Sequence, residues 1–364
     1  MGGGIIGLSI AWRAAQLGLS VTVLDKDARP AGASWVAAGM LAPVTEADFG
    51  EDALLGLNLE GARRWPDFTA ELSESAGTDL NATEPGSLYV AVDRDQLEAL
   101  RRLYDYQLSV GLTVSWLDSR SCRKLEPGLH PSTRGGILAD GDAAVDPRKV
   151  IDALVTALKH ASVPVSYGSR VASIRRGDPP AAVLEDGEAV AGRCIVLAAG
   201  CWSTLIPGVA DEIKDAVRPV KGQILRLRTS FSHPALRRVV RNEEVYLVPR
   251  PNGELIVGAT VEEKGFDTTL TAGAVFELLR AAGEVFPGVR ELELVEASVG
   301  LRPGSRDNLP LIGPSGVPGV VVACGHYRNG ILQAPVTADA IAHLLAKGEL
   351  PEGNDPYDPR RFAS

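Results

Sequence analysis

Three glycines at the start of the 364-residue chain have the spacing of a loop that binds phosphate groups. Gly2, Gly4 and Gly7 fit the pattern G-x-G-x-x-G, which allows a tight turn, the close approach of a pyrophosphate and close packing of the next helix. The N-terminus of that helix would hold the anion through its free N–H groups and its dipole. Asp25 follows Gly7 by 18 residues and could accept hydrogen bonds from a ribose 2′-hydroxyl. This spacing favours FAD or NAD over NADP.

The elements around these glycines follow the order of a βαβ unit. An apolar pattern with helical spacing covers residues 8–17, and a β-branched run at residues 21–24 ends at Asp25. Only Met1 precedes Gly2, although the fingerprint places a central strand there. We therefore expect the natural chain to begin about nine residues earlier, enough for one strand.

Composition excludes several classes of protein. The net charge of −9 argues against a nucleic-acid partner, which would need a basic face. The chain has no run of about 18 apolar residues, which a membrane-spanning helix would need, and no convincing signal peptide, so we expect a cytoplasmic protein. The four cysteines, at positions 122, 194, 201 and 324, lack the spacing of metal ligands. We expect buried thiols and no metal site.

The hydrophobic pattern predicts the remaining elements. Helices are expected at 53–76, 95–111, 147–160, 272–286 and 335–346, and strands at 86–92, 135–145, 163–167, 171–175, 194–198 and 319–325. Residues 217–260 alternate between apolar and polar, with a hairpin turn at 251–253, which indicates an antiparallel sheet.

This order predicts an α/β fold built from two domains. The nucleotide-binding domain would be discontinuous, comprising residues 1–83, 141–216 and 297–364. An antiparallel-sheet substrate domain, made of residues 84–140 and 217–296, would be inserted into it.

The segment at 33–43, Ala-Ser-Trp-Val-Ala-Ala-Gly-Met-Leu-Ala-Pro, resembles the flavin-contacting loop of glycine oxidases, within the D-amino-acid oxidase and sarcosine oxidase superfamily. Further similar segments follow in order, at 219–223, 246–250, 257–260, 300–304 and 325–332. The resemblance implies a Rossmann-like FAD domain with an α+β second domain. It also implies oxidative deamination of glycine, other small amines or D-amino acids, with O2 reduced to H2O2. A role in forming the thiazole of thiamine and a homotetramer are implied as well.

The same resemblance implies where the substrate binds. Arg302 would bind the carboxylate of the amino acid in a bidentate pair, from a Gly-Leu-Arg-Pro-Gly turn. Tyr246 would add a phenolic hydrogen bond to that carboxylate, and Arg328 would lie near the substrate. No acid or base is expected among the catalytic groups, because a neutral amine can pass hydride directly to the flavin.

The cofactor is expected to be FAD bound without a covalent link. The residues expected to bind it from the fingerprint and the resemblance are Gly2, Gly4, Ile5, Ile6, Gly7, Asp25, Lys26, Ala33, Ser34, Ala38, Gly39, Met40, Val171, His326, Tyr327, Arg328, Asn329, Gly330, Ile331 and Leu332. We expect His326 to be packed beneath its loop rather than to act as a base.

Three alternatives stay open at this point. The protein could be a dehydrogenase that passes electrons to a quinone or another acceptor. It could prefer sarcosine or D-proline, because the sequence does not give the size of the pocket. It could also be a non-catalytic protein that binds FAD.

Overall fold

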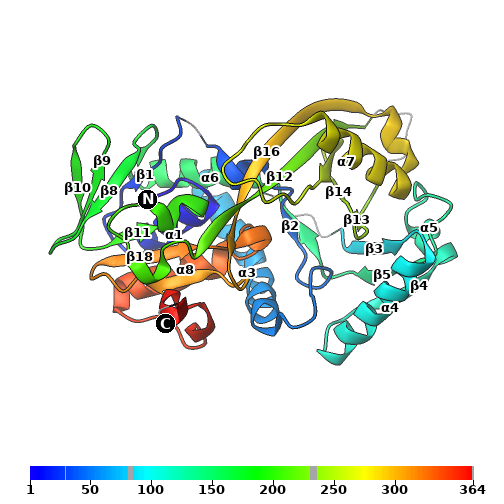
Figure 1. The fold of residues 1–364 in the computed structure, drawn as a ribbon, viewed down its shortest axis with the longest axis horizontal. Helices are drawn as coiled ribbons and strands as arrows, with labels where there is room; N and C mark the ends of the chain where they lie inside the picture. Colours follow the sequence, from blue (N-terminus) through cyan, green and yellow to red (C-terminus); the bar gives the residue numbers. More distant parts are fainter. Residues whose placement is uncertain (29, 81–84, 230–235, 363–364) are drawn as a thin grey trace.

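Two long strands connect the two ends of the molecule. The structure is a computed structural model, and it describes residues 1–28, 30–80, 85–229 and 236–362. Figure 1 shows α1, α6, α8 and both termini at one end, and β3, β5, α4 and α5 at the other. The strands β12 (Val217–Arg228) and β16 (Glu293–Ser305) run between them. None of the described helices combines the length and apolar character that a membrane span requires.

Small parallel sheets form the end that contains the N-terminus. The parallel pairs are β1 (Val23–Leu24) with β7 (Val165–Ser166) and β11 (Ile195–Leu197) with β18 (Val320–Cys324), and β17 (Leu311–Pro314) joins β18 in antiparallel orientation. The chain start lies between these two sheets. The Met1 amine donates to the Val196 carbonyl at 2.7 Å, and the Gly2 N–H donates to the Leu24 carbonyl at 2.8 Å. The helix and the following strand of the predicted βαβ unit are confirmed as α1 and β1, whereas no strand precedes α1 among the described residues.

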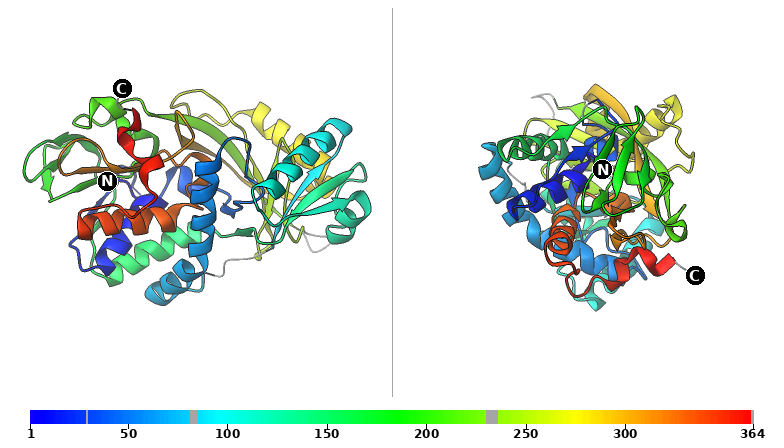
Figure 2. Two further views of the ribbon diagram at one scale, coloured as in Figure 1. Left: turned by 90° about the horizontal axis from the view of Figure 1, so that it is seen from below. Right: turned by 90° about the vertical axis from the view of Figure 1, so that its left-hand side faces the viewer.

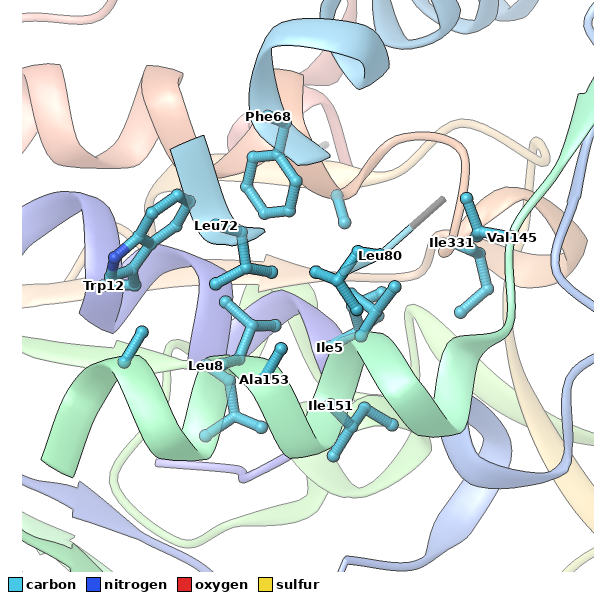
Figure 3. Close-up of a cluster of buried hydrophobic side chains, with 14 of the residues drawn as sticks. Ile5, Leu8, Trp12, Phe68, Leu72, Leu80, Val145, Ile151, Ala153 and Ile331 are labelled. Carbon is cyan, nitrogen blue, oxygen red and sulfur yellow. The ribbon is translucent and has the colours of Figure 1, made fainter. Parts of the chain in front are cut away.

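Four helices cover these sheets, and Figure 2 shows three of them stacked at one end of the molecule. They are α1 (Ile5–Gln16), α3 (Asp52–Ala76), α6 (Pro147–His160) and α8 (Ala334–Lys347). Their apolar faces meet in a core in which Leu8, Phe68 and Leu72 are fully buried (Figure 3). Trp12 packs edge-on against Phe68, with ring centroids 5.2 Å apart. This packing fixes the direction of α1, whose N-terminus begins the site described below.

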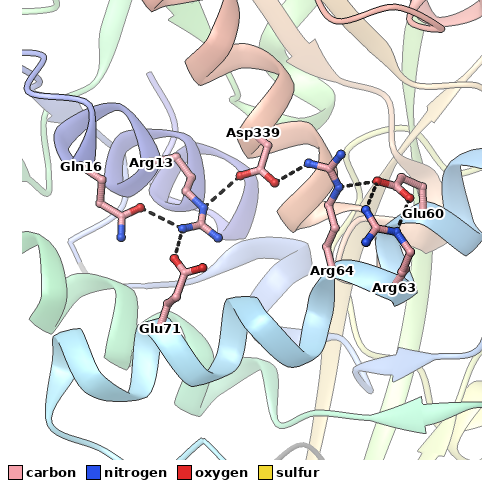
Figure 4. Close-up of polar contacts among 7 residues, drawn as sticks. All are labelled: Arg13, Gln16, Glu60, Arg63, Arg64, Glu71 and Asp339. Carbon is pink, nitrogen blue, oxygen red and sulfur yellow. Dashed lines mark hydrogen bonds and ion pairs between the residues drawn. The ribbon is translucent and has the colours of Figure 1, made fainter.

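Ion pairs join the same helices at the surface. Arg13 of α1 contacts Glu71 of α3 and Asp339 of α8, and Asp339 also pairs with Arg64 of α3 (Figure 4). Since all of these side chains are partly exposed, each pair adds little stability alone, and the apolar core beneath them holds the helices together.

An eight-stranded sheet forms most of the other half. Its order is β16, β12, β15 (Glu254–Gly258), β14 (Tyr246–Pro249), β13 (Val239–Arg241), β3 (Ser87–Ala91), β5 (Gly135–Ala139) and β4 (Ser115–Asp118). Neighbouring strands are antiparallel except β13 and β3, which are parallel, so this one pair joins the two inserted stretches. The helices α7 (Ala272–Val285), α4 (Arg94–Ser109) and α5 (Ser119–Leu125) pack against the sheet.

The smaller elements complete the chain. They are α2 (Gly32–Val36), β2 (Met40–Leu41), β6 (Ala143–Ala144), β8 (Val171–Arg175), β9 (Ala181–Leu184), β10 (Ala189–Ala191) and the 3-10 helices η1 (Gly200–Leu205), η2 (Asp211–Ile213), η3 (Pro287–Glu291), η4 (Tyr327–Asn329), η5 (Asp355–Tyr357) and η6 (Pro359–Phe362). The long helices and the antiparallel sheet match the prediction and confirm the α/β fold class. Of the predicted domain boundaries, the one at 83–84 lies outside the described residues, and the one at 296–297 falls within β16.

The turn predicted around Arg302 is wrong, because residues 300–304 lie in the middle of β16. The pairing of β16 with β12 continues through this segment, with Pro303 opposite Pro219 and Gly304 opposite Arg218. Glycine and proline indicate a turn when only local preference is considered, but twelve residues of β12 provide a partner for the whole stretch.

Candidate functional site

A cavity of about 710 Å³ extends from the N-terminus of α1 to the inner face of the eight-stranded sheet. Gly2, Gly4, Ile5 and Ile6 line one end, and residues of β12, β14 and β16 line the other. The volume lies within the range of about 300–1,000 Å³ usual for sites that enclose a small molecule or cofactor. The cavity therefore connects the predicted nucleotide loop to the predicted substrate residues.

The N-terminus of α1 is suited to an anion. Gly4 is its N-cap and provides no side-chain cap, while the Ile5 N–H donates to the Ser34 hydroxyl at 3.1 Å. Gly2 has a φ of 104°, and a Cβ there would collide with the Ala198 carbonyl. Gly7 does not line the cavity, but a Cβ on it would collide with the Gly2 carbonyl, so it allows the helix to pack against the loop.

Asp25 lies beside this loop at the end of β1. Its two carboxylate oxygens accept hydrogen bonds from the Gly3 N–H at 2.5 Å and from the Asp27 N–H at 2.8 Å. Each oxygen keeps a further lone pair, which could accept a ribose hydroxyl. Lys26 lies 4.4 Å from the centre of the Trp202 ring, and both line the cavity together with Val171.

The predicted flavin-contacting segments meet in the middle of the cavity. Its lining includes Ala33, Ser34, Ala38, Gly39 and Met40 from one segment, and His326, Tyr327, Arg328, Gly330 and Ile331 from the other. Asn329 and Leu332 are buried behind this lining. The Leu332 carbonyl accepts a hydrogen bond from the Trp65 indole at 3.0 Å, which ties the second segment to α3.

Two side chains in this region are chemically inert. The His326 ring is buried with Nε2 3.0 Å from the Thr337 hydroxyl, and burial lowers its pKa to about 3, so it is neutral and held in place. Burial also favours the neutral form of Cys324, because it raises the pKa of the thiol to about 12. The sulfur therefore stays protonated and is a poor nucleophile. Both placements agree with a packed histidine and a structural cysteine.

Arg302 has the most informative position at the sheet end. Its Nη1 donates to the Thr260 carbonyl at 3.0 Å, and its guanidinium lies over Gly222, where a Cβ would collide with it. Three other arginines line the cavity, and each has an acidic partner: Arg170 with Glu185, Arg241 with Glu46 and Arg328 with Glu51, at N···O distances of 3.4, 3.5 and 3.6 Å. Among the described residues, Arg302 has no such partner, and its charge is left for an anionic ligand.

Tyr246 completes this end of the cavity. It lies opposite Gly258 in the β14–β15 pair, and its ring lies over that glycine. Burial raises the pKa of the phenol, and the adjacent Arg302 guanidinium opposes this shift only in part. The phenol therefore stays protonated and can donate a hydrogen bond beside the Arg302 guanidinium.

Glu46 and Arg241 also line the cavity near Tyr246, and neither was predicted from the sequence as a site residue. Arg241 lies opposite Tyr246 across β13 and β14, and its Nη1 also donates to the Thr45 carbonyl at 3.1 Å. Asp142 is buried and accepts the Thr45 hydroxyl at 2.6 Å, and burial raises its pKa to about 6 despite that bond. Glu46 lies in a loop and Arg241 in the distant strand β13, so no local sequence motif indicates that the two side chains form an ion pair.

These features together fit FAD. The N-terminus of α1, whose N-cap Gly4 provides no side chain, suits the pyrophosphate, and Asp25 suits the adenosine ribose. The segments at 33–40 and 326–331 line the same cavity of about 710 Å³ as Arg302 and Tyr246. The chemistry that this arrangement supports is two-electron oxidation of a ligand with an acidic group.

Comparison with known proteins identifies relatives over the whole chain. A family model described as FAD dependent oxidoreductase (DAO) matches residues 1–344. The chain is 31% identical to a glycine oxidase from Geobacillus kaustophilus, covering 96% of this chain and 92% of the relative. It is 34% identical to the bifunctional protein ThiO/ThiG of Synechocystis, and there it spans 53% of the relative's length.

Solved structures agree with these matches. The crystal structure of glycine oxidase from Geobacillus kaustophilus superposes with a TM-score of 0.92 at 30% identity, covering 99% of this chain and 97% of the other. Iminodiacetate oxidase from Chelativorans sp. BNC1 gives 0.88 at 26% identity, covering 98% and 97%. The resemblance expected from the segments at 33–43 and 325–332 is thereby confirmed.

Proposed function

The chain belongs to the DAO family of FAD-dependent oxidoreductases, and on this premise we propose that it oxidises glycine and other small amines at the Arg302 end of its cavity. FAD is the cofactor. We propose that it is bound without a covalent link, which the protonated and buried Cys324 supports. The named relatives include a glycine oxidase and an iminodiacetate oxidase, which act on small amines that carry a carboxylate.

The free guanidinium of Arg302 carries this proposal. A small amino acid presents mainly a carboxylate and an amine, and a guanidinium without an acidic partner binds the former with charge-assisted hydrogen bonds. Tyr246 adds a donor on the same side. Met40 and Tyr327, from the two segments expected to contact the flavin, line the same cavity as Arg302 and Tyr246.

The protein's part in the reaction is then orientation. Bound FAD supplies the two-electron acceptor that takes hydride from the α-carbon of the amine. Arg302 and Tyr246 hold the carboxylate so that this C–H bond has a fixed direction, which removes much of the entropic cost of the encounter. No base is needed when the amine enters neutral, and the neutral, anchored His326 is consistent with that.

We propose that O2 is the electron acceptor and is reduced to H2O2, and that the amine is oxidised to the imine, which water converts to the 2-oxo acid with release of ammonia, or of the corresponding amine when the substrate nitrogen carries a substituent. The match to a bifunctional ThiO/ThiG protein supports a role in making the thiazole of thiamine, where the imine itself would be used.

The experiment is a substrate panel with purified protein saturated with FAD. Glycine, sarcosine, D-alanine and D-proline are compared by oxygen uptake and peroxide formation. We expect glycine to be oxidised with equimolar H2O2. Reduction of an artificial dye without oxygen uptake would instead assign a dehydrogenase, and an unreactive flavin with all four would reject amine oxidation.

A further inference from the structure

Lys221 is a completely buried lysine that the proposed reaction does not use. It lies in β12, whose side chains alternate between the two faces of the sheet. Gly222 and Ile224 line the cavity, whereas Leu225 packs in the core beneath α7. Lys221 therefore points away from the cavity, behind the strand position that supports the Arg302 guanidinium.

The Lys221 ammonium is compensated by one loop. Its Nζ donates to Asp267 Oδ2 at 2.8 Å and to the Thr269 carbonyl at 2.6 Å. The hydrogen bond from Lys221 holds the pKa of Asp267 below its usual range. Because an unpaired buried ammonium is very costly, the loop at 259–271 must keep this position for the charge to be tolerated.

Gln223, also buried and on the same face of β12, makes a second connection to this loop. Its amide donates to Glu262 at 2.7 Å and accepts the Thr271 N–H at 2.9 Å. Its backbone N–H donates to the Thr260 hydroxyl at 2.9 Å. Partial burial opposes ionisation of Glu262, yet hydrogen bonds from Gln223 and Thr260 lower its pKa to about 2, so it stays charged.

The same loop forms part of the cavity. The Thr260 carbonyl accepts the hydrogen bond from Arg302 Nη1. Val261 lines the cavity, and Phe266 packs 5.5 Å from the ring of Trp202, which also lines it. A shift of this loop would therefore move the acceptor that orients the guanidinium.

We propose that Lys221 is a positioning residue for the substrate carboxylate, because it fastens the loop at 259–271 whose Thr260 carbonyl holds Arg302. This inference rests on the proposed function and adds a residue that touches neither substrate nor cofactor. Its effect should appear mainly in binding of the carboxylate, because the Thr260 carbonyl accepts directly from Arg302. The loop approaches the nucleotide end through the contact of Phe266 with Trp202, whereas the α1 N-terminus and Asp25 lie on other elements.

The test replaces Lys221 with methionine, which keeps most of the volume and removes the ammonium. We expect KM for glycine, and the dissociation constant of acetate measured through the flavin spectrum, to rise by about tenfold, the loss of one positioned hydrogen bond. We expect kcat to change less than KM and the FAD content to stay at the wild-type level. Lys221→Arg should restore part of the binding.

A matched control removes another cation of the same strand. Arg228 is exposed and pairs with Glu293 at 3.2 Å, so Arg228→Met should leave both constants unchanged. Acetate binding by Lys221→Met at the wild-type level would overturn the proposal.

Limited trypsin digestion gives a readout that does not depend on activity. Lys264 lies in the loop with its side chain 53% exposed, so a loosened loop should be cut after Lys264 faster than in the wild type. Unchanged cleavage in Lys221→Met would also overturn the proposal. If the wild type neither oxidises amines nor binds acetate, while Lys221→Met still speeds cleavage, the proposed function fails and the fastening itself stands.

A second variant covers the case in which Lys221→Met does not fold. Asp267→Asn keeps an oxygen acceptor for Lys221 and removes the charge from the loop side, where the carboxylate is 40% exposed. For Asp267→Asn we expect the acetate dissociation constant and the rate of cleavage after Lys264 both to rise, but by less than in Lys221→Met. No change in either would contradict the proposal.

Discussion

At the scale of single residues, whether an arginine can bind the substrate carboxylate depends on whether its guanidinium already has an acidic partner. The resemblance suggested both Arg302 and Arg328 for the substrate, and both line the cavity. Arg328 faces Glu51 and is 40% exposed. Arg302 donates to the Thr260 carbonyl and lies beside the Tyr246 phenol, and it has no acidic partner among the described residues. Residue type suggests a carboxylate site, but only the packed structure distinguishes the arginine that is free to bind one.

Tyr246→Phe tests the second donor at this site. The ring would stay over Gly258, while the hydrogen bond from the phenol would be lost. We expect the dissociation constant of acetate to rise about tenfold, or about 1.4 kcal/mol, as for one hydrogen bond to a charged group. FAD content should not change. Titration of the flavin spectrum with acetate measures this, and an unchanged constant would remove Tyr246 from the substrate site.

At the scale of elements, two glycines on neighbouring strands make room for the polar side chains. Gly222 of β12 lies beneath the Arg302 guanidinium, and Gly258 of β15 lies beneath the Tyr246 ring. A Cβ at either position would overlap its neighbour, so the sheet can bring Arg302 and Tyr246 together only where these strands lack side chains.

Gly222→Ala should displace Arg302 without disturbing the nucleotide end. Since the guanidinium is the end of a flexible side chain, we expect the protein to fold and retain FAD while KM for glycine rises by about tenfold or more. Gly273→Ala is the matched control, because a Cβ in that position of α7 meets nothing within 4 Å. Steady-state kinetics of the two variants decide the point. If Gly222→Ala and Gly273→Ala had the same KM for glycine, Gly222 would not determine the position of Arg302.

The sequence predicted the elements that depend on local pattern and missed those that depend on a distant partner. The helices at 53–76 and 147–160 show clear apolar periodicity, and both were predicted within one residue of their bounds. Residues 300–304 were mistaken for a turn because their strand exists only through pairing with β12. The Glu46–Arg241 and Lys221–Asp267 pairs were not predicted for the same reason, since each joins segments distant in sequence.

At the scale of the whole molecule, the cavity joins two halves with different tasks. The α1 end is built from small sheets, both parallel and antiparallel, and from helices, and it offers an anion site and Asp25. The eight-stranded sheet provides Arg302 and Tyr246 at the other end. β12 and β16 link the two, so a cofactor lying along the cavity would contact both halves.

The match to a glycine oxidase structure over nearly the whole chain shows that this arrangement belongs to the family fold. An identity of about 30% to glycine oxidase shows that the chain is an FAD-dependent oxidoreductase. It does not show which amine the chain prefers, which depends on the residues that line the cavity around Arg302. The predicted domain boundaries and the homotetramer stay predictions.

Anaerobic mixing of the FAD-loaded protein with glycine tests whether Arg302 presents an amino acid to the flavin. In the wild type, the visible flavin absorption should bleach as glycine is oxidised. In Arg302→Met, FAD should stay bound, while bleaching at subsaturating glycine should slow by about a hundredfold, as expected for loss of a charge-assisted pair. Bleaching of Arg302→Met at the wild-type rate would show that the carboxylate is held elsewhere.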